Sequence, residues 1–154
     1  MLETARDQGH PWLHQLSFFL ANRVGSLEKV SNALSEADVR ICGISILDAH
    51  DHAVVRLIVD DPGKAEKVLE SQDRTVCVTR VLGVVVDDKL ANPIGALLDP
   101  LLRAELSVCY AYALIARPND EAVVALLADN VDMATRVLRK ADFKLISQRD
   151  LQRD

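Results

Sequence analysis

The sequence predicts an α+β protein built from two tandem βαββαβ units, each an antiparallel sheet with both helices on one face. One observation is a short pattern, Asn-x-[Val/Ile]-Gly-[Ser/Ala]-Leu, that occurs at Asn22–Leu27 and again at Asn92–Leu97. Other similar segments follow in the same order in both halves, and each half alternates strand-like runs with helical stripes. We expect residues 1–11 to form an N-terminal tail, residues 12–79 the first unit and residues 80–150 the second.

The first half begins with a strand and a helix. Leu13–Leu20 is rich in apolar and aromatic residues, which is typical of a strand. A turn follows, with Gly25 at the start of the next helix. The apolar residues of this helix form one stripe at three- and four-residue spacing, namely Leu27, Val30, Leu34 and Ala37.

Two β-branched runs come next and predict a hairpin. Val39–Leu47 and Ala53–Val59 are the expected strands, and the polar segment Asp48–His52 is the expected turn. A second helix then begins at Asp61-Pro62, because Asp is a favoured N-cap and Pro fits the first helical position. Its buried face is Ala65, Val68 and Leu69, and the closing strand is Thr75–Thr79.

The second half repeats this order. Its predicted strands are Val81–Val86, Leu106–Ala116, Ala122–Asp129 and Phe143–Ser147. Its first predicted helix is capped by Asn92-Pro93 and ends near Arg103, and its second spans Val131 to Lys140. The connection Arg117–Asp120 is a predicted turn, and Gln148–Asp154 is a polar tail.

Strand, helix, strand, strand, helix, strand is the ferredoxin-like pattern, in which right-handed crossovers place both helices on one face of the sheet. Small sheets of this kind leave edge strands that are prone to pairing with other chains. We therefore expect the edges to pair with each other or across a homodimer.

With this repeat, the chain resembles tandem ACT-domain proteins over about residues 12 to 150. The resemblance is carried by Gln15–Leu20 with Asn22-x-x-Gly25-x-Leu27, and by Val81–Val86 with Asn92-x-x-Gly95-x-Leu97. It implies a regulatory protein that senses an amino acid at interfaces between ACT units, near the glycine turn of one unit and the second strand of the other. In the family pattern a proline precedes the glycine, whereas Val24 and Ile94 stand there in this sequence.

Elementary chemistry also makes the two glycine turns candidate ligand sites. A helix N-terminus offers unpaired N–H groups and a partial positive charge that attract a carboxylate, and glycine lets a ligand approach the backbone. An apolar strand would then select the ligand's side chain. The turn candidates are Asn22, Arg23, Val24, Gly25, Ser26, Leu27, Asn92, Ile94, Gly95, Ala96 and Leu97. The wall candidates are Ile41, Cys42, Val108, Cys109 and Tyr110. The alternative is that each glycine only makes its turn.

Composition and motifs exclude several classes of protein. The chain is 49% hydrophobic, carries a net charge of −5 and has no basic block, which argues against nucleic-acid binding. No stretch reaches the roughly 18 apolar residues of a membrane span, and the N-terminus lacks the apolar core of a signal peptide. Three scattered cysteines favour a reduced, cytoplasmic protein without a disulfide framework or zinc site.

We expect no metal, no cofactor and no catalytic residues. His50 and His52 lie with Asp48 and Asp51 in one short turn, which favours solvated loop residues over converging metal ligands. The sequence lacks phosphate-binding, nucleophile-elbow and metalloprotease motifs. The alternative to an amino-acid sensor is a ligand-free interaction module or regulatory subunit of a metabolic enzyme, such as an amino-acid biosynthetic enzyme. A small enzyme would require a cleft with a perturbed acid or base.

Overall fold

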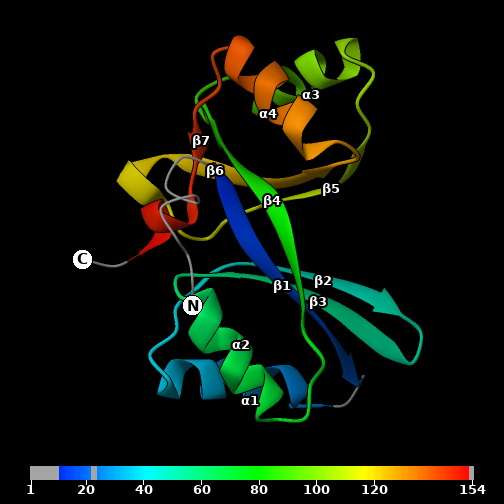
Figure 1. Cartoon of the computed structure of the whole chain (residues 1–154), viewed down its shortest axis with the longest axis vertical. Coiled ribbons are helices and arrows are strands. Elements are labelled where there is room, and N and C mark those ends of the chain that lie inside the picture. The colour runs from blue at the N-terminus through cyan, green and yellow to red at the C-terminus, as the bar shows by residue number, and fades with distance from the viewer. Residues whose placement is uncertain (1–10, 22–23, 153–154) are drawn as a thin grey trace. The chain divides into compact units, whose positions relative to one another are not determined.

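The computed structural model describes residues 11–21 and 24–152, which fall into two compact units. The N-terminal unit comprises His14–Thr79. The C-terminal unit comprises Arg80–Leu151 and the described residues up to Leu13. The elements of both units are drawn in Figure 1.

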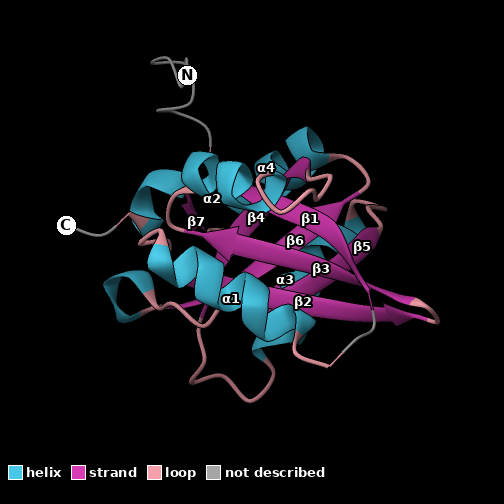
Figure 2. Cartoon of the chain, turned by 90° about the horizontal axis from the view of Figure 1, so that it is seen from below, coloured by secondary structure: helices cyan, strands magenta, loops and turns pink. Residues whose placement is uncertain are grey.

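The N-terminal unit contains three strands and two helices followed by the beginning of a further strand. They are β1 (Trp12–Ala21), α1 (Ser26–Glu36), β2 (Ile41–Ala49), β3 (His52–Val59) and α2 (Pro62–Glu70). Strand β3 lies between β1 and β2 and is antiparallel to both, with Leu57 opposite Leu16 on one side and Ile44 on the other. Helices α1 and α2 both cover one face of these strands (Figure 2).

The hydrophobic core of this unit lies between the two helices and the sheet. Helix α1 buries Val30 and Leu34, and α2 buries Ala65 and Leu69. These side chains meet alternate residues of β1 and β3 in one cluster. A fully buried leucine contributes about 1.5–3 kcal/mol, so the four helical positions alone stabilise the unit substantially. The predicted helical stripes are confirmed.

The C-terminal unit repeats the architecture with its own fourth strand. It contains β4 (Cys77–Val86), α3 (Pro93–Arg103), β5 (Val108–Ala113), β6 (Ala122–Ala128), α4 (Val131–Lys140) and β7 (Leu145–Ile146), with short 3-10 helices at Pro118–Asp120 and Gln148–Leu151. The strand order is β5-β6-β4-β7, and every pair is antiparallel. Helices α3 and α4 bury Leu97, Leu101, Ala134 and Leu138 against β4 and β6. The predicted α+β class, with ferredoxin-like units and helices on one sheet face, is confirmed.

Several predicted boundaries are wrong. The expected strands Thr75–Thr79 and Val81–Val86 form one continuous strand, β4, because no glycine, proline or turn residue separates them. The expected last strand is only Leu145–Ile146. The tail expected to be polar contributes Leu151, which is 4% exposed and closes part of the core.

The four α-helices of the described residues all end near a left-handed residue. This residue directly follows the cap of α1, α3 and α4, and comes one position later after α2. In each case the following amide donates to the carbonyl of a buried leucine five positions earlier, as in Leu106 N to Leu101 O at 3.0 Å. This is the Schellman arrangement, which usually uses glycine at the left-handed position. Here the left-handed residues are all acidic: Asp38, Asp73, Glu105 and Asp142. The shared motif supports the duplication inferred from sequence.

A pair of hydrogen bonds made by an aspartate is also repeated in the two units. The carboxylate of Asp60, just after β3, accepts a hydrogen bond from Arg40 N at 2.8 Å, and Asp60 N donates to Arg40 O at 3.1 Å. Asp129 makes the same pair of bonds with Ser107, at 3.3 and 3.0 Å. In each unit an aspartate therefore fixes the connection that enters the second strand.

Candidate functional site

The first glycine turn is an open helix N-terminus. Gly25 is the N-cap of α1 and has φ +83°, a left-handed backbone that glycine adopts without strain. A Cβ built on Gly25 would meet no atom of residues 11–21 and 24–152 within 4 Å, and Val24 beside it is fully exposed. Asn22 and Arg23, two of the predicted ligand-binding residues, lie outside the described residues. The turn therefore leaves space beside the backbone.

The amides behind this turn are not capped by the N-cap residue. Lys29 N donates to Gly25 O at 3.1 Å and closes the first helical turn, but glycine has no side chain to accept from the amides before it. These amides, from Ser26 to Glu28, carry the partial positive charge of the helix N-terminus. Glu28 is the acidic residue of this first turn.

The second glycine turn is closed by its own asparagine. Asn92 is the N-cap of α3, and its Oδ1 accepts a hydrogen bond from Gly95 N at 2.9 Å. A Cβ on Gly95 would lie 2.8 Å from Asn92 Cγ, so the missing side chain makes room for the cap. The difference arises from Pro93, whose fixed φ suits the first helical position and starts α3 two residues before the glycine. The shared sequence pattern therefore forms two different turns.

The remaining turn residues differ in exposure. Ser26 and Leu27 are half-buried, and Leu27 packs against the N-terminal core. Ile94 and Ala96 are exposed, whereas Leu97 is 1% exposed and belongs to the C-terminal core. Leu97 therefore contributes to the core and not to a ligand-binding surface.

The predicted wall residues begin the second strand of each unit, at β-bulges. The register of β2 against β3 shifts between Ile41 and Gly43, and that of β5 against β6 shifts between Val108 and Tyr110. The extra residue is Cys42 in one unit and Cys109 in the other. The two cysteines hold corresponding positions in the sequence repeat, but the repeat does not show that each one forms a bulge. Cys42 is fully buried and Cys109 is exposed. Bulges need tertiary register, so sequence alone did not indicate them.

Within a unit, the wall lies at the opposite end of the sheet from the turn. Ile41 is opposite Val59, at the end of β3, whereas Ala21, which precedes the first turn, is opposite His52, at its beginning. These ends are separated by most of an eight-residue strand, about 23 Å at 3.3 Å per residue. The C-terminal unit has the same arrangement, with Val108 opposite Ala128 and Val86 opposite Ala122. Neither unit brings its predicted turn and wall together.

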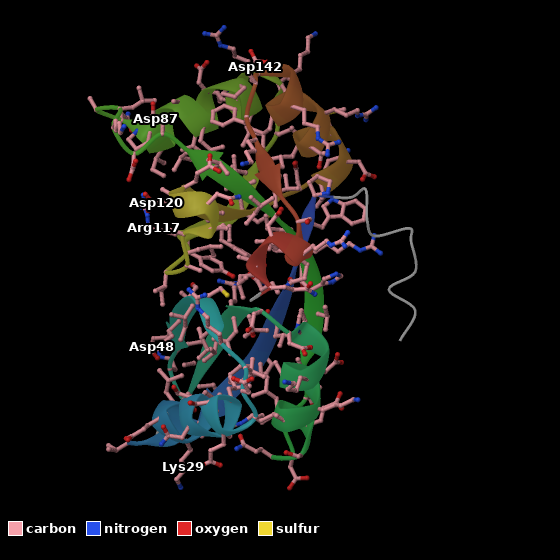
Figure 3. The ribbon with its side chains drawn as sticks, turned by 90° about the vertical axis from the view of Figure 1, so that its left-hand side faces the viewer. Lys29, Asp48, Asp87, Arg117, Asp120 and Asp142 are labelled. Carbon is pink, nitrogen blue, oxygen red and sulfur yellow. The ribbon has the colours of Figure 1, made fainter. Side chains whose placement is uncertain are left out.

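A charged cleft of about 390 Å³ lies in the C-terminal unit, at the end of β4. Its apolar lining is Val85, Val86, Ala122 and Phe143, and its charged lining is Asp87, Asp88, Asp120, Glu121, Asp142 and Lys144. Figure 3 shows Asp120 beside Arg117 on this side of the unit. The cleft was not predicted from the sequence, where the available signal was the acidic residues at three strand and helix ends.

Ion pairs occupy much of the cleft's rim. Lys144 Nζ lies 2.7 Å from Glu121 Oε1, and this hydrogen bond and charge raise the pKa of Lys144 above its ordinary value. Arg117 lies 3.1 Å from Asp88 and 3.7 Å from Asp120. Pairs this exposed contribute little to stability, because solvent screens them. Their arrangement indicates a solvated rim rather than acid–base machinery.

No group of three or more His, Cys, Asp or Glu side chains in residues 11–21 and 24–152 is placed to hold a metal ion. None of the helices described there has the length and apolar character required to cross a bilayer.

Comparisons with known proteins place the chain in a family. The family model described as an ACT domain pair matches residues 12–153. Protein BT0572 from Bacteroides thetaiotaomicron has a similar structure, with a TM-score of 0.83 and 27% identity over 93% of this chain and 97% of that chain. No curated protein matches the sequence significantly.

Two aspartate kinase structures share the fold. The regulatory subunit of aspartate kinase from Thermus thermophilus, in its ligand-free form, has a TM-score of 0.60 and 14% identity, over 86% of this chain and 93% of that chain. Aspartate kinase from Clostridium acetobutylicum has a TM-score of 0.55 and 14% identity, over 84% of this chain and 33% of that chain. The repeated βαββαβ units, the recurring glycine pattern and the family match across almost the whole chain agree, and the chain belongs to the family of ACT domain pairs.

Proposed function

We propose that this ACT domain pair is a regulatory protein that binds a small molecule, an amino acid, at the Gly25 turn. The observation that supports the proposal is the contrast between the turns: no atom of the described residues lies beside the left-handed backbone of Gly25, whereas Asn92 fills the corresponding space at Gly95. The ligand carboxylate would accept hydrogen bonds from the first-turn amides of α1. The Gly95 turn would have a structural role and bind no ligand.

The wall that selects the ligand's side chain would come from outside the N-terminal unit's own second strand, because Ile41 lies at the far end of that unit's sheet. Cys42 is buried and is not a wall candidate, whereas the exposed Cys109 of a second copy of the chain would be one. The aspartate kinase regulatory subunit that shares the fold makes a regulatory role reasonable, although similarity at 14% identity extends only to the fold.

A homodimer is part of the proposal. Among the described residues, β2 pairs only with β3 and β5 only with β6, so both are edge strands of their units. Exposed edges associate readily with other chains unless they are covered. Sedimentation equilibrium would test the dimer, and a mass equal to one chain at all concentrations would contradict it.

A second candidate function is a partner-binding subunit of a metabolic enzyme that binds no ligand. The observation that favours it is a stripe of exposed apolar residues on α3, beside its buried face. Ile94, Leu98 and Leu102 recur every four residues and are 46%, 37% and 75% exposed. In both candidates the chain performs no chemistry itself and acts in the cytoplasm.

A thermal-shift screen against the twenty amino acids separates the candidates. Binding to the folded state raises the melting temperature by mass action, so one or a few amino acids should produce a rise. The rise should disappear in Gly25→Asn, since asparagine tolerates a left-handed backbone and its side chain would fill the open space. It should persist in Asn92→Ala, which leaves the Gly25 turn intact. A flat response to every amino acid would favour the partner-binding subunit.

A further inference from the structure

A second hollow lies in the C-terminal unit, beside α4 and away from the charged cleft. Its volume is about 380 Å³, which suits a small organic ligand. The lining residues are Pro11, Trp12, Asp132, Thr135, Arg136 and Arg139. It combines an aromatic wall with charged groups from one helix face.

The charge of this hollow is positive, in a chain whose net charge is −5. Arg136 and Arg139 are one turn apart on α4, so their side chains leave the same face of the helix. Neither guanidinium has an ion-pair partner among residues 11–21 and 24–152. A third guanidinium, that of Arg80, lies 4.5 Å from the centre of the Trp12 ring. Asp132 is the single acid of the lining.

The apolar side of the hollow is held in place by the core. Trp12 packs against the C-terminal core, and Thr135 is 8% exposed with its hydroxyl donating to Val131 O at 2.8 Å. The threonine hydroxyl therefore already donates its hydrogen to the helix backbone. The two arginines are the free donors that face a ligand, and Trp12 with Pro11 supplies the flat apolar surface.

We propose that this hollow binds a small organic oxyanion, with a carboxylate or phosphate group held by Arg136 and Arg139 and its apolar body against Trp12. Guanidinium groups match the geometry of these oxyanions and form charge-assisted hydrogen bonds with them. Asp132 disfavours a polyanion, so the site suits a ligand with one oxyanion group. This site is independent of the Gly25 turn, because it lies in the other unit and uses side chains in place of backbone amides.

The chain has one tryptophan, so its fluorescence reports directly on this hollow. The probes are 3-phenylpropanoate, phenyl phosphate and the neutral 3-phenylpropanamide, titrated against the full chain with calorimetry as a second readout. We expect a saturable change in Trp12 emission with at least one anion, and at least tenfold weaker binding of the amide. Which anion binds more tightly distinguishes a carboxylate ligand from a phosphate ligand.

The double variant Arg136→Gln/Arg139→Gln should bind the anions at least tenfold more weakly than the unmodified chain. Lys140→Gln is the matched control, because Lys140 is an exposed cation on the same helix that does not line the hollow. It should leave binding unchanged. Since all three side chains are exposed, the variants are expected to fold, and circular dichroism checks this. Equal binding of the neutral amide, unchanged binding in the double variant, or no saturable signal with either anion would overturn the proposal.

Discussion

The Asn92 side chain accepts a hydrogen bond from Gly95 N at 2.9 Å and fills the space that a Cβ on Gly95 would need. Gly25, at the corresponding position in the other repeat, has a left-handed backbone instead, and no atom in the described part of the chain lies where its Cβ would be. One short pattern therefore serves two purposes. In the second repeat the glycine completes a helix cap, and in the first it leaves a helix N-terminus accessible.

Replacing Gly95 with alanine should not stabilise the protein as such a change usually does in a helix. A Cβ would displace Asn92 and remove its cap, which is worth about 0.5–2 kcal/mol and offsets the gain in helix propensity. Gly63→Ala is the matched control, because its Cβ would meet only Asp61 Oδ1 at an ordinary 3.7 Å. That variant should gain about 0.4–1 kcal/mol. Urea unfolding measures both, and an equal gain in both would contradict the cap's role.

The two strand-anchoring aspartates should differ in their contribution to stability. Asp60 is 7% exposed and bonds Arg40 N at 2.8 Å, whereas Asp129 is exposed and bonds Ser107 N at 3.3 Å. Asp60→Ala leaves a shielded amide without this acceptor and should cost about 1–3 kcal/mol. In Asp129→Ala, water can replace the carboxylate, so the loss should be smaller. Equal losses in chemical unfolding would show that burial does not set the difference.

Replacing Glu105 should stabilise the protein, because this residue has a left-handed backbone (φ 57°) past the end of α3. A side chain in this conformation costs about 1–2 kcal/mol. Replacement by glycine removes this cost, but the larger entropy of glycine in the unfolded state cancels part of the gain. We expect Glu105→Gly to stabilise the protein by about 1 kcal/mol, a rise of roughly 2–4 °C in melting temperature. Glu36→Gly, a change at the last residue of α1, should be destabilising and serves as the control. A fall in melting temperature for Glu105→Gly would refute the strain argument.

The Lys144–Glu121 pair predicts a specific pH dependence. Because the folded-state pKa of Lys144 is raised by the hydrogen bond and charge of Glu121, the lysine is charged in both states well below pH 10.5 and the pair contributes fully there. The contribution is lost as pH rises above 10.5 and through the raised folded pKa. Lys144→Met should be less stable than the unmodified chain near pH 8, with the difference shrinking at higher pH. A difference independent of pH up to 12 would contradict the pair's role.

The sequence predicted the helices well because their apolar stripes continue into the cores. Val30 with Leu34, and Ala134 with Leu138, recur at helical spacing and are all buried. The cap at Asn92 was likewise predicted from local chemistry, because a polar residue before proline is sufficient to start a helix.

The parts that were not predicted depend on tertiary register. The bulges at Cys42 and Cys109 come from strand pairing, and no local pattern marks them. The hollow beside Trp12 joins residues from the two ends of the sequence, and periodicity within α4 does not show which neighbour its arginines face. The difference between Gly25 and Gly95 was partly visible, since Pro93 has no counterpart beside Gly25, but the closed cap required side-chain positions.

The most direct test of ligand binding at the Gly25 turn is a nitrogen-15 amide titration with whichever amino acid raises the melting temperature. We expect saturable chemical-shift changes at the amides of Ser26, Leu27 and Glu28, with the amide of Gly95 unmoved because it already donates to Asn92. Saturable shifts at Gly95 with unchanged first-turn amides in α1 would contradict the account.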